Sequence, residues 1–190
     1  MKTINQEEIK QTPTNSITFK KAKEQAINHI KKRAGGSIDD WYQKKINLVS
    51  DLVNYPTSSI QLRSVSASAK AIIIKAHLKE IYPNTMFKVY KTSYNSLTIE
   101  YVKGVYPYGL QQKTNQYSDR GDTDLMTDYF DVDTYLHYEN AITNQQHFYK
   151  SIEEVKEDLD QRKKEKELSK TDYYDDLIKH LENLVKVDIS

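Results

Sequence analysis

A chain of 190 residues with a formal net charge of +1 is long enough to bury its own core, and it suits one domain with a helical appendage. It has no cysteine, which excludes disulfide bonds, thiolate metal sites and cysteine nucleophiles. No run approaches the roughly 18 apolar residues of a membrane span, and the first residues lack the apolar stretch of a secretory signal, so we expect a cytoplasmic protein.

The near-neutral total conceals a division of charge along the chain. Residues 1–117 contain 18 Lys and Arg against 8 Asp and Glu, an excess of +10, whereas residues 118–190 contain 10 against 19, an excess of −9. The acidic excess is concentrated in residues 118–139, where seven acids accompany Arg120 alone. Such a division suits binding of nucleic acid on one side and of a basic partner on the other, and it equally suits attraction between two parts of one fold.

The N-terminal part is predicted to be helical after a loose arm at residues 1–16, which are polar and contain Pro13. A helix is expected over residues 18–33 and ends at Gly35-Gly36, because apolar residues recur every three or four positions. A second helix is expected from Ile38 to about Asn54. The expected buried positions are Phe19, Ala22, Ala26 and Ile30 in the first helix, and Ile38, Tyr42, Val49 and Val53 in the second.

The middle of the chain predicts a helix followed by a hairpin. Residues 57–66 are polar and β-branched, which favours a short connecting strand, and residues 67–81 carry an unbroken apolar stripe that predicts a third helix. Alternating residues predict strands over 86–91 and 97–102 with a tight turn between them. The pattern weakens from residue 104 to 146, and two further helices are expected over 151–168 and 172–187.

These elements indicate an α+β fold, with a small antiparallel sheet covered by helices and with helical segments at both ends. The expected organisation is a loose arm at residues 1–16, an α+β domain over residues 17–146 and a C-terminal helical pair over residues 147–190.

A cluster of aspartates between residues 119 and 133 is the densest chemical feature of the sequence. Carboxylates at this density suit a surface that imitates phosphate spacing and binds a basic partner, a site for Mg²⁺ or Ca²⁺, or a polar loop with turn aspartates. The spacing fits no calcium-binding loop, and we expect no metal and no cofactor. The members of the cluster are Asp119, Asp122, Asp124, Asp128, Asp131 and Asp133.

Tyrosine is the second unusual feature, since the chain has 15 tyrosines against one tryptophan. A tyrosine ring offers a large contact area with a polar tip, so it suits interfaces as well as cores. The tyrosines around the acidic cluster are therefore expected to contact a partner; they are Tyr106, Tyr108, Tyr117 and Tyr129.

Basic residues along the first predicted helix are candidates for contacts with nucleic acid. They suit salt-dependent binding of phosphates, and they equally suit a solvated outer face. They are Lys20, Lys21, Lys31, Lys32 and Arg33. The five histidines have no metal-binding spacing, although His137 lies near the aspartates and is a candidate general base with Asp133 or Glu139. The common hydrolase and nucleotide-binding motifs are absent from the sequence.

A resemblance to a known family is carried by Leu78-Lys79-Glu80-Ile81-Tyr82-Pro83, then by Met86-Phe87-Lys88-Val89 and Leu97-Thr98-Ile99-Glu100-Tyr101, and later by Met126-Thr127-Asp128-Tyr129-Phe130. With these segments, residues 65–136 resemble the large polyvalent-protein-associated domain 29. The turn between the strands lacks the glycines of the family pattern. The resemblance implies a protein of phages, plasmids or conjugative elements, a background that includes anti-CRISPR inhibitors of Cas effectors.

The leading hypothesis from the sequence is a counter-defence protein of a mobile element that inhibits a host nuclease such as Cas9, by binding the nuclease, its guide RNA or both. The expected partner is thus a Cas effector rather than a membrane, and we expect a binding protein rather than an enzyme. Two alternatives stay open. One is an accessory nucleic-acid-binding protein for transfer or replication of the element. The other is a metal-dependent nuclease that uses Asp122, Asp124 and Asp128.

Overall fold

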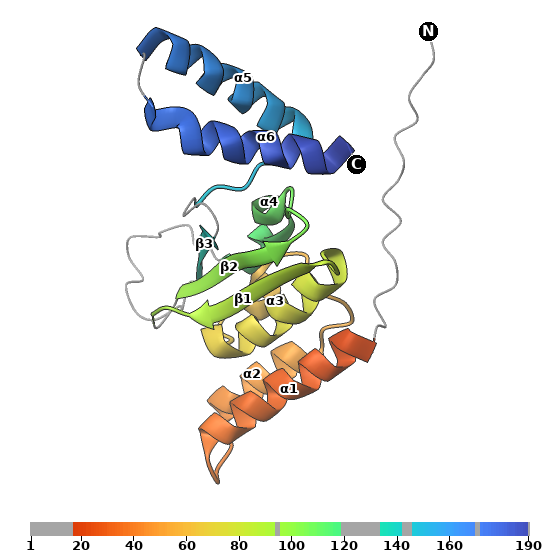
Figure 1. The fold of residues 1–190 in the computed structure, drawn as a ribbon. Coiled ribbons are helices and arrows are strands. Elements are labelled where there is room, and N and C mark those ends of the chain that lie inside the picture. The colour runs from red at the N-terminus through yellow and green to blue at the C-terminus, as the bar shows by residue number, and fades with distance from the viewer. Residues whose placement is uncertain (1–16, 94–95, 119–133, 142–145, 170–171, 190) are drawn as a thin grey trace, which may run out of the picture.

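The computed structural model describes residues 17–93, 96–118, 134–141, 146–169 and 172–189 (Figure 1). Within these ranges the chain forms six α-helices, three short 3₁₀ helices and one three-stranded sheet, which confirms the predicted α+β class. Figure 1 shows the sheet between two helical groups, with α1 and α2 at one end and α5 and α6 at the other. The predicted loose arm at residues 1–16 lies outside the described residues.

The first helix, α1 (Ile17–Ala34), buries the face that the sequence predicts. It ends where Gly35 adopts a φ of +72°, a left-handed conformation that glycine accepts without the clash of a Cβ. The buried residues are Phe19, Ala22, Ala26 and Ile30.

The second helix, α2 (Asp40–Ser50), is shorter than predicted. It begins after Asp39, whose carboxylate accepts a hydrogen bond of 2.9 Å from the backbone N–H of Tyr42. Val49 is buried as expected, but the predicted inner positions Ile38 and Val53 are wrong, because they lie outside the helix and are 43% and 81% exposed.

The third helix, α3 (Ala67–Ile81), has the predicted bounds and lies against the sheet. The segment before it is the 3₁₀ helix η1 (Ser59–Leu62), so the expected connecting strand at residues 57–66 is wrong. A local side-chain bond favours this turn over a strand, since Oε1 of Gln61 accepts a hydrogen bond of 2.7 Å from the backbone N–H of Thr57.

The sheet contains β1 (Thr85–Lys91), β2 (Ser96–Gly104) and β3 (Tyr135–Asn140), with β2 in the centre. The predicted hairpin is confirmed, because β1 and β2 pair antiparallel with Val89 opposite Ile99. The sheet is mixed rather than wholly antiparallel, since β3 pairs parallel to β2 with Tyr138 opposite Ile99. A long connection precedes β3, and it includes α4 (Leu110–Thr114) and the 3₁₀ helix η2 (Asn115–Tyr117).

The end of β2 depends on a glycine. Gly104 has a φ of +109°, and a Cβ on this residue would overlap the backbone carbonyl of Asn84. The close approach lets the N–H of Val105 donate to the carbonyl of Asn84 at 3.2 Å, while the hydroxyl of Thr85 donates to the carbonyl of Val105 at 2.7 Å. These two hydrogen bonds therefore hold the start of β1 and the end of β2 together, at the end of the hairpin opposite its turn.

The C-terminal helices α5 (Ile152–Ser169) and α6 (Asp175–Ile189) pack against each other as a pair, joined through the 3₁₀ helix η3 (Asp172–Tyr174). They are close to the two helices that the sequence predicts, and they bury Val155, Leu159 and Leu181. None of the helices in the described ranges is long and apolar enough to cross a membrane. The proposed division at residue 146 stays a prediction.

A stack of buried rings crosses the core from α1 to η2. The centroids of Phe19 and Tyr55 are 4.6 Å apart, and the ring of Tyr55 stacks on His77 at 4.3 Å. The hydroxyl of Tyr117, a residue that is 1% exposed, forms a hydrogen bond of 2.8 Å with Nδ1 of His77. Burial lowers the pKa of His77 to about 4, although Glu80 opposes the shift.

We predict a pH-dependent stability from His77. The unfolded chain binds a proton at this imidazole below a pKa of about 6.5, whereas the folded chain does so only near 4. The stabilisation is therefore present above pH 6.5 and is lost as the pH falls toward 4, which amounts to about 3 kcal/mol of unfolding free energy. Urea unfolding between these pH values should show a shallower pH dependence for His77→Phe than for the wild type.

The exposed His137 provides the control for this experiment. The variant His137→Phe makes the same replacement at an exposed position and leaves the buried ring stack intact. Equal pH dependence in His77→Phe and the wild type would contradict the assignment.

Candidate functional site

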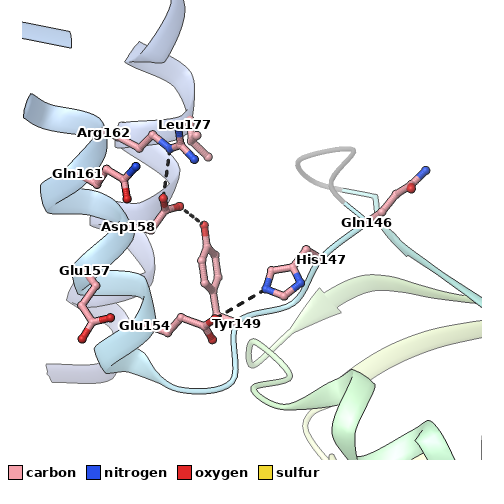
Figure 2. Close-up of a pocket in the computed structure, with 9 residues that line it drawn as sticks. All are labelled: Gln146, His147, Tyr149, Glu154, Glu157, Asp158, Gln161, Arg162 and Leu177. Atoms are coloured by element: carbon pink, nitrogen blue, oxygen red, sulfur yellow. Dashed lines mark hydrogen bonds and ion pairs between the residues drawn. The ribbon is translucent and has the colours of Figure 1, made fainter. Parts of the chain in front are cut away.

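An open cleft of about 640 Å³ lies between α5 and the segment that precedes it (Figure 2). One wall is formed by Gln146, His147 and Tyr149 and the other by α5, with Leu177 of α6 contributing at one end. The side chains that carry charge in the cleft are Glu154, Glu157, Asp158 and Arg162, together with the ionisable His147.

The first wall is fixed by hydrogen bonds to α4 and the loop before it. The carbonyl of Tyr149 accepts a bond of 2.9 Å from the N–H of Gly109, and the N–H of Tyr149 donates to the hydroxyl of Tyr106 at 3.2 Å. The side chain of Gln111 donates to the carbonyl of Gln146 at 3.3 Å and accepts from the N–H of Phe148 at 3.4 Å. This segment therefore has a defined position although it lacks regular secondary structure.

The second wall begins at the N-terminus of α5. The hydroxyl of Ser151 accepts a hydrogen bond of 3.4 Å from the N–H of Glu154, and the carboxylate of Glu154 accepts one of 2.5 Å from the N–H of Lys150. This exchange resembles a capping box, and it places a carboxylate at the positive end of the helix dipole. Nε2 of His147 lies 3.8 Å from the same carboxylate.

The side chain of Tyr149 connects the segment before α5 to α5 itself (Figure 2). The hydroxyl of Tyr149 donates to Oδ2 of Asp158 at 2.5 Å, and Nε of Arg162 donates to Oδ1 of Asp158 at 3.1 Å. Burial, followed by the bond to Asp158 and its negative charge, raises the pKa of Tyr149 well above its usual value. The phenol therefore stays protonated and keeps its role as a donor.

The cleft has a negative charge. Among the described residues that line it, and with His147 counted as neutral, three carboxylates accompany one guanidinium, which leaves a formal charge of −2. Such a surface attracts basic side chains by complementarity of charge. Across the described ranges of the chain, no group of histidines and acids is arranged to hold a metal ion.

The structure buries two of the four predicted contact tyrosines, Tyr106 and Tyr117, in the core. Tyr106 is 7% exposed, and burial raises its pKa to about 12. Tyr117 is also buried, and Tyr108 is half-buried beside Tyr82, whose hydroxyl donates to its carbonyl at 2.7 Å. Tyr106 and Tyr117 therefore offer almost no surface to a partner, because their rings fill the core.

The predicted acidic cluster lies outside the described residues, so the structure does not show where it lies relative to the cleft. This holds for Tyr129 and for all six aspartates, including the three that the metal-dependent nuclease alternative requires. The members are Asp119, Asp122, Asp124, Asp128, Asp131 and Asp133.

The predicted basic residues of α1 are all exposed. Lys20 and Lys31 are eleven residues apart, about three turns of helix, so they share one side of α1, and Lys21 and Lys32 share an adjacent side. Arg33 belongs to neither row, since it continues the buried row of Ala22, Ala26 and Ile30 beyond the core.

Reasoning from the sequence did not select the residues of the cleft. The spacing of Ser151 and Glu154 fits a capping box and could have located the start of the helix. Asp158 and Arg162 are four residues apart, which indicates a helical ion pair. The contact between Tyr149 and Asp158 has no local sequence signal, because it requires a bend before α5.

Comparison with known proteins identifies one family. A family model described as large polyvalent protein associated domain 29 matches residues 65–187, which confirms the resemblance and extends it from the hairpin through α5 into α6. No curated protein matches the chain. No solved structure matches it.

We predict that Tyr149→Phe loosens the contact between α5 and the preceding segment. The variant keeps the ring but leaves Asp158 without one hydrogen bond, at a cost of about 1–2 kcal/mol in unfolding free energy. Urea unfolding measures this cost, and amide hydrogen exchange should show weaker protection in α5. The control is Tyr173→Phe, since Tyr173 is 84% exposed and should tolerate loss of its hydroxyl. Equal stability of the two variants would contradict the prediction.

Proposed function

The chain belongs to the large polyvalent protein associated domain 29 family, and we propose that it is a counter-defence protein of a phage or plasmid that inhibits a host defence nuclease. The family sets a polyvalent-protein-associated, mobile-element context. The leading candidate for the target is Cas9 with its guide RNA, so the chain would act as an anti-CRISPR-like inhibitor in the cytoplasm of the bacterial host.

The observation that carries the proposal is the acid-lined cleft beside α5. A nuclease that holds nucleic acid does so with basic side chains in a channel, and those side chains bind carboxylates as well as phosphates. Glu154, Glu157 and Asp158 line this cleft from α5, and Figure 2 shows Asp158 pointing toward Tyr149. A basic side chain of the target would enter the cleft and find several acceptors.

The acidic cluster between residues 119 and 133 adds to this surface by its charge, an argument that rests on the sequence. In the proposed mechanism the acids occupy the channel in place of nucleic acid, and no covalent step is required. Electrostatic attraction then sets the association rate, which should fall as the ionic strength rises. The exposed lysines of α1, at the opposite end of the structure in Figure 1, are available for contacts with guide RNA.

A cleavage assay tests the proposal. A panel of purified Cas9 proteins with guide RNA is incubated with increasing amounts of the chain, and cleavage of target DNA is followed. We expect inhibition of at least one member, and we expect Glu157→Lys to weaken it by at least tenfold, because the variant places a cation in the cleft. Undiminished cleavage across the panel would refute the proposed target.

A matched variant separates the cleft from the total charge. Asp160 is exposed on the same helix but does not line the cleft, so Asp160→Lys changes the net charge equally. It should inhibit as the wild type does. Equal loss of inhibition in both variants would mean that net charge, rather than the cleft, determines binding. Replacement of the six aspartates between residues 119 and 133 by asparagine tests the cluster in the same assay.

A second candidate function is an accessory nucleic-acid-binding protein, and the exposed lysine rows of α1 favour it. A gel shift with single-stranded DNA should show binding that weakens steeply with salt, since each contacted phosphate releases a counterion. The double variant Lys21→Gln/Lys32→Gln should bind more weakly and with a smaller salt slope. The control is Lys75→Gln/Lys79→Gln on α3, which removes two exposed lysines elsewhere. Absence of a shift at low salt would exclude this function.

A further inference from the structure

A second cavity, of about 310 Å³, lies among the end of α1, the start of α2 and the start of α3, at the opposite end of the structure from the acidic cleft (Figure 1). Among the described residues that line it, three are basic and none is acidic. They are Arg33, Lys45 and Lys91, and Trp41 and Ser66 line the cavity beside them.

Lys45 is the most unusual of these residues, because it is a cation that is only 7% exposed. It lies on the buried side of α2 beside Ile46 and Val49, and its ammonium rests over the ring of Trp41, one helical turn away. Among the described residues, none forms a hydrogen bond or an ion pair with this ammonium.

The surroundings of Lys45 disfavour its charged form. Burial, and then the charge of Arg33, lower the pKa of Lys45, while Asp39 opposes the shift. Asp39 is engaged in capping α2 through the N–H of Tyr42. Among the described residues no carboxylate pairs with this largely buried lysine, so an anion in the cavity would be favourable.

Ser66 supplies a second unsatisfied group in the same cavity. It is the N-cap residue of α3, yet its hydroxyl forms no capping bond, and its buried Oγ has no hydrogen-bond partner among the described residues. A helix N-terminus carries free N–H groups and the positive end of the dipole, both of which favour an anion. The hydroxyl and the helix end therefore point to the same kind of ligand as Lys45.

Arg33 reaches this cavity because of its position on α1. It continues the row of Ala22, Ala26 and Ile30, so it lies on the side of α1 that borders the cavity, and its side chain is exposed there. A guanidinium presents paired N–H donors that match the oxygens of a phosphate.

We propose that this cavity binds a phosphate group through Lys45, Ser66 and Arg33, with the phosphate delivered by a nucleotide or by a single-stranded nucleic acid. Trp41 is 55% exposed at the cavity and offers its ring to the base that follows the phosphate. The cavity volume falls at the lower end of the range for ligand pockets, which suits a single nucleotide unit. The proposal is independent of nuclease inhibition, because it concerns the other end of the structure.

Trp41 makes the proposal directly measurable, since it is the single tryptophan of the chain. Its fluorescence is recorded while inorganic phosphate, AMP or a short 5′-phosphorylated RNA is added to the full chain. We expect a saturable change with at least one probe, as an anion draws Lys45 away from the ring. Equal affinity for AMP and RNA would identify a nucleotide as the source, whereas tighter binding of RNA would identify a strand.

Variants test the assigned residues. Lys45→Met and Ser66→Ala should each weaken binding by roughly tenfold or more, which is the loss expected for one charge-assisted hydrogen bond. The matched controls Lys44→Met and Ser50→Ala remove the same groups from exposed positions on α2 and should bind as the wild type does.

The melting temperature of Lys45→Met separates a binding role from a structural role. If Lys45 only stabilised the fold, its replacement would lower the melting temperature. Without ligand, this variant should melt at the wild-type temperature or above it, because it removes the charge from a side chain that is largely buried. A large fall in the melting temperature would overturn the proposal. The absence of a fluorescence change with all three probes, or equal binding by Lys45→Met and Lys44→Met, would also overturn it.

Discussion

The anchoring of residues 148 and 149 is the contact on which the rest of the structure depends. The α5–α6 pair buries a narrow apolar stripe, so it needs a firm attachment to the sheet. Phe148 is fully buried, with its ring centroid 6.2 Å from Tyr101 and 5.8 Å from Tyr106, and Tyr149 connects this core to Asp158 of α5. The acidic cleft lies between α5 and the segment before it, and these contacts of Phe148 and Tyr149 fix the position of that segment relative to α5.

The abundance of tyrosine has a structural explanation in the same region. A buried tyrosine fills a core with its ring and connects to a loop through its hydroxyl. The hydroxyl of Tyr101 donates to the carbonyl of Gly104 at 2.8 Å, and that of Tyr82 donates to the carbonyl of Tyr108 at 2.7 Å. These bonds stabilise the irregular segment after β2, where phenylalanine would leave backbone carbonyls without donors.

The periodicity of apolar residues in the sequence predicts correctly the helix that buries a continuous apolar stripe and the strands in which apolar and polar residues alternate. Helix α3 and the β1–β2 hairpin belong to this class, since each positions its side chains by short-range periodicity. The strand β3 could not be predicted in this way, because it has only six residues and its parallel partner is far away in the sequence. Its pairing is decided by tertiary contacts, as is the burial of Tyr106 and Tyr117.

The candidate sites show the same division between local and tertiary information. The exposure of the lysines on α1 follows from helical geometry, and the sequence is sufficient to predict it. The cavity at the start of α3 is different, because it combines Arg33, Lys45 and Ser66 from three separate helices or their caps. A lysine in the apolar row between Tyr42 and Val49 is a visible irregularity. Only the fold shows that it lines a cavity together with a serine whose hydroxyl has no partner among the described residues.

The division of charge along the chain acquires a spatial meaning from these sites. Charges within the α5–α6 pair neutralise one another in part, since Lys163 lies 2.8 Å from Glu182 and Lys166 pairs with Asp175. The acids of the cleft and the bases of the cavity lie at opposite ends of the structure, so they are not placed to neutralise each other. A chain arranged in this way can contact a basic protein surface at one end and a phosphate at the other. If both proposals hold, the partner would be a complex of protein and nucleic acid, because such a complex presents both kinds of surface.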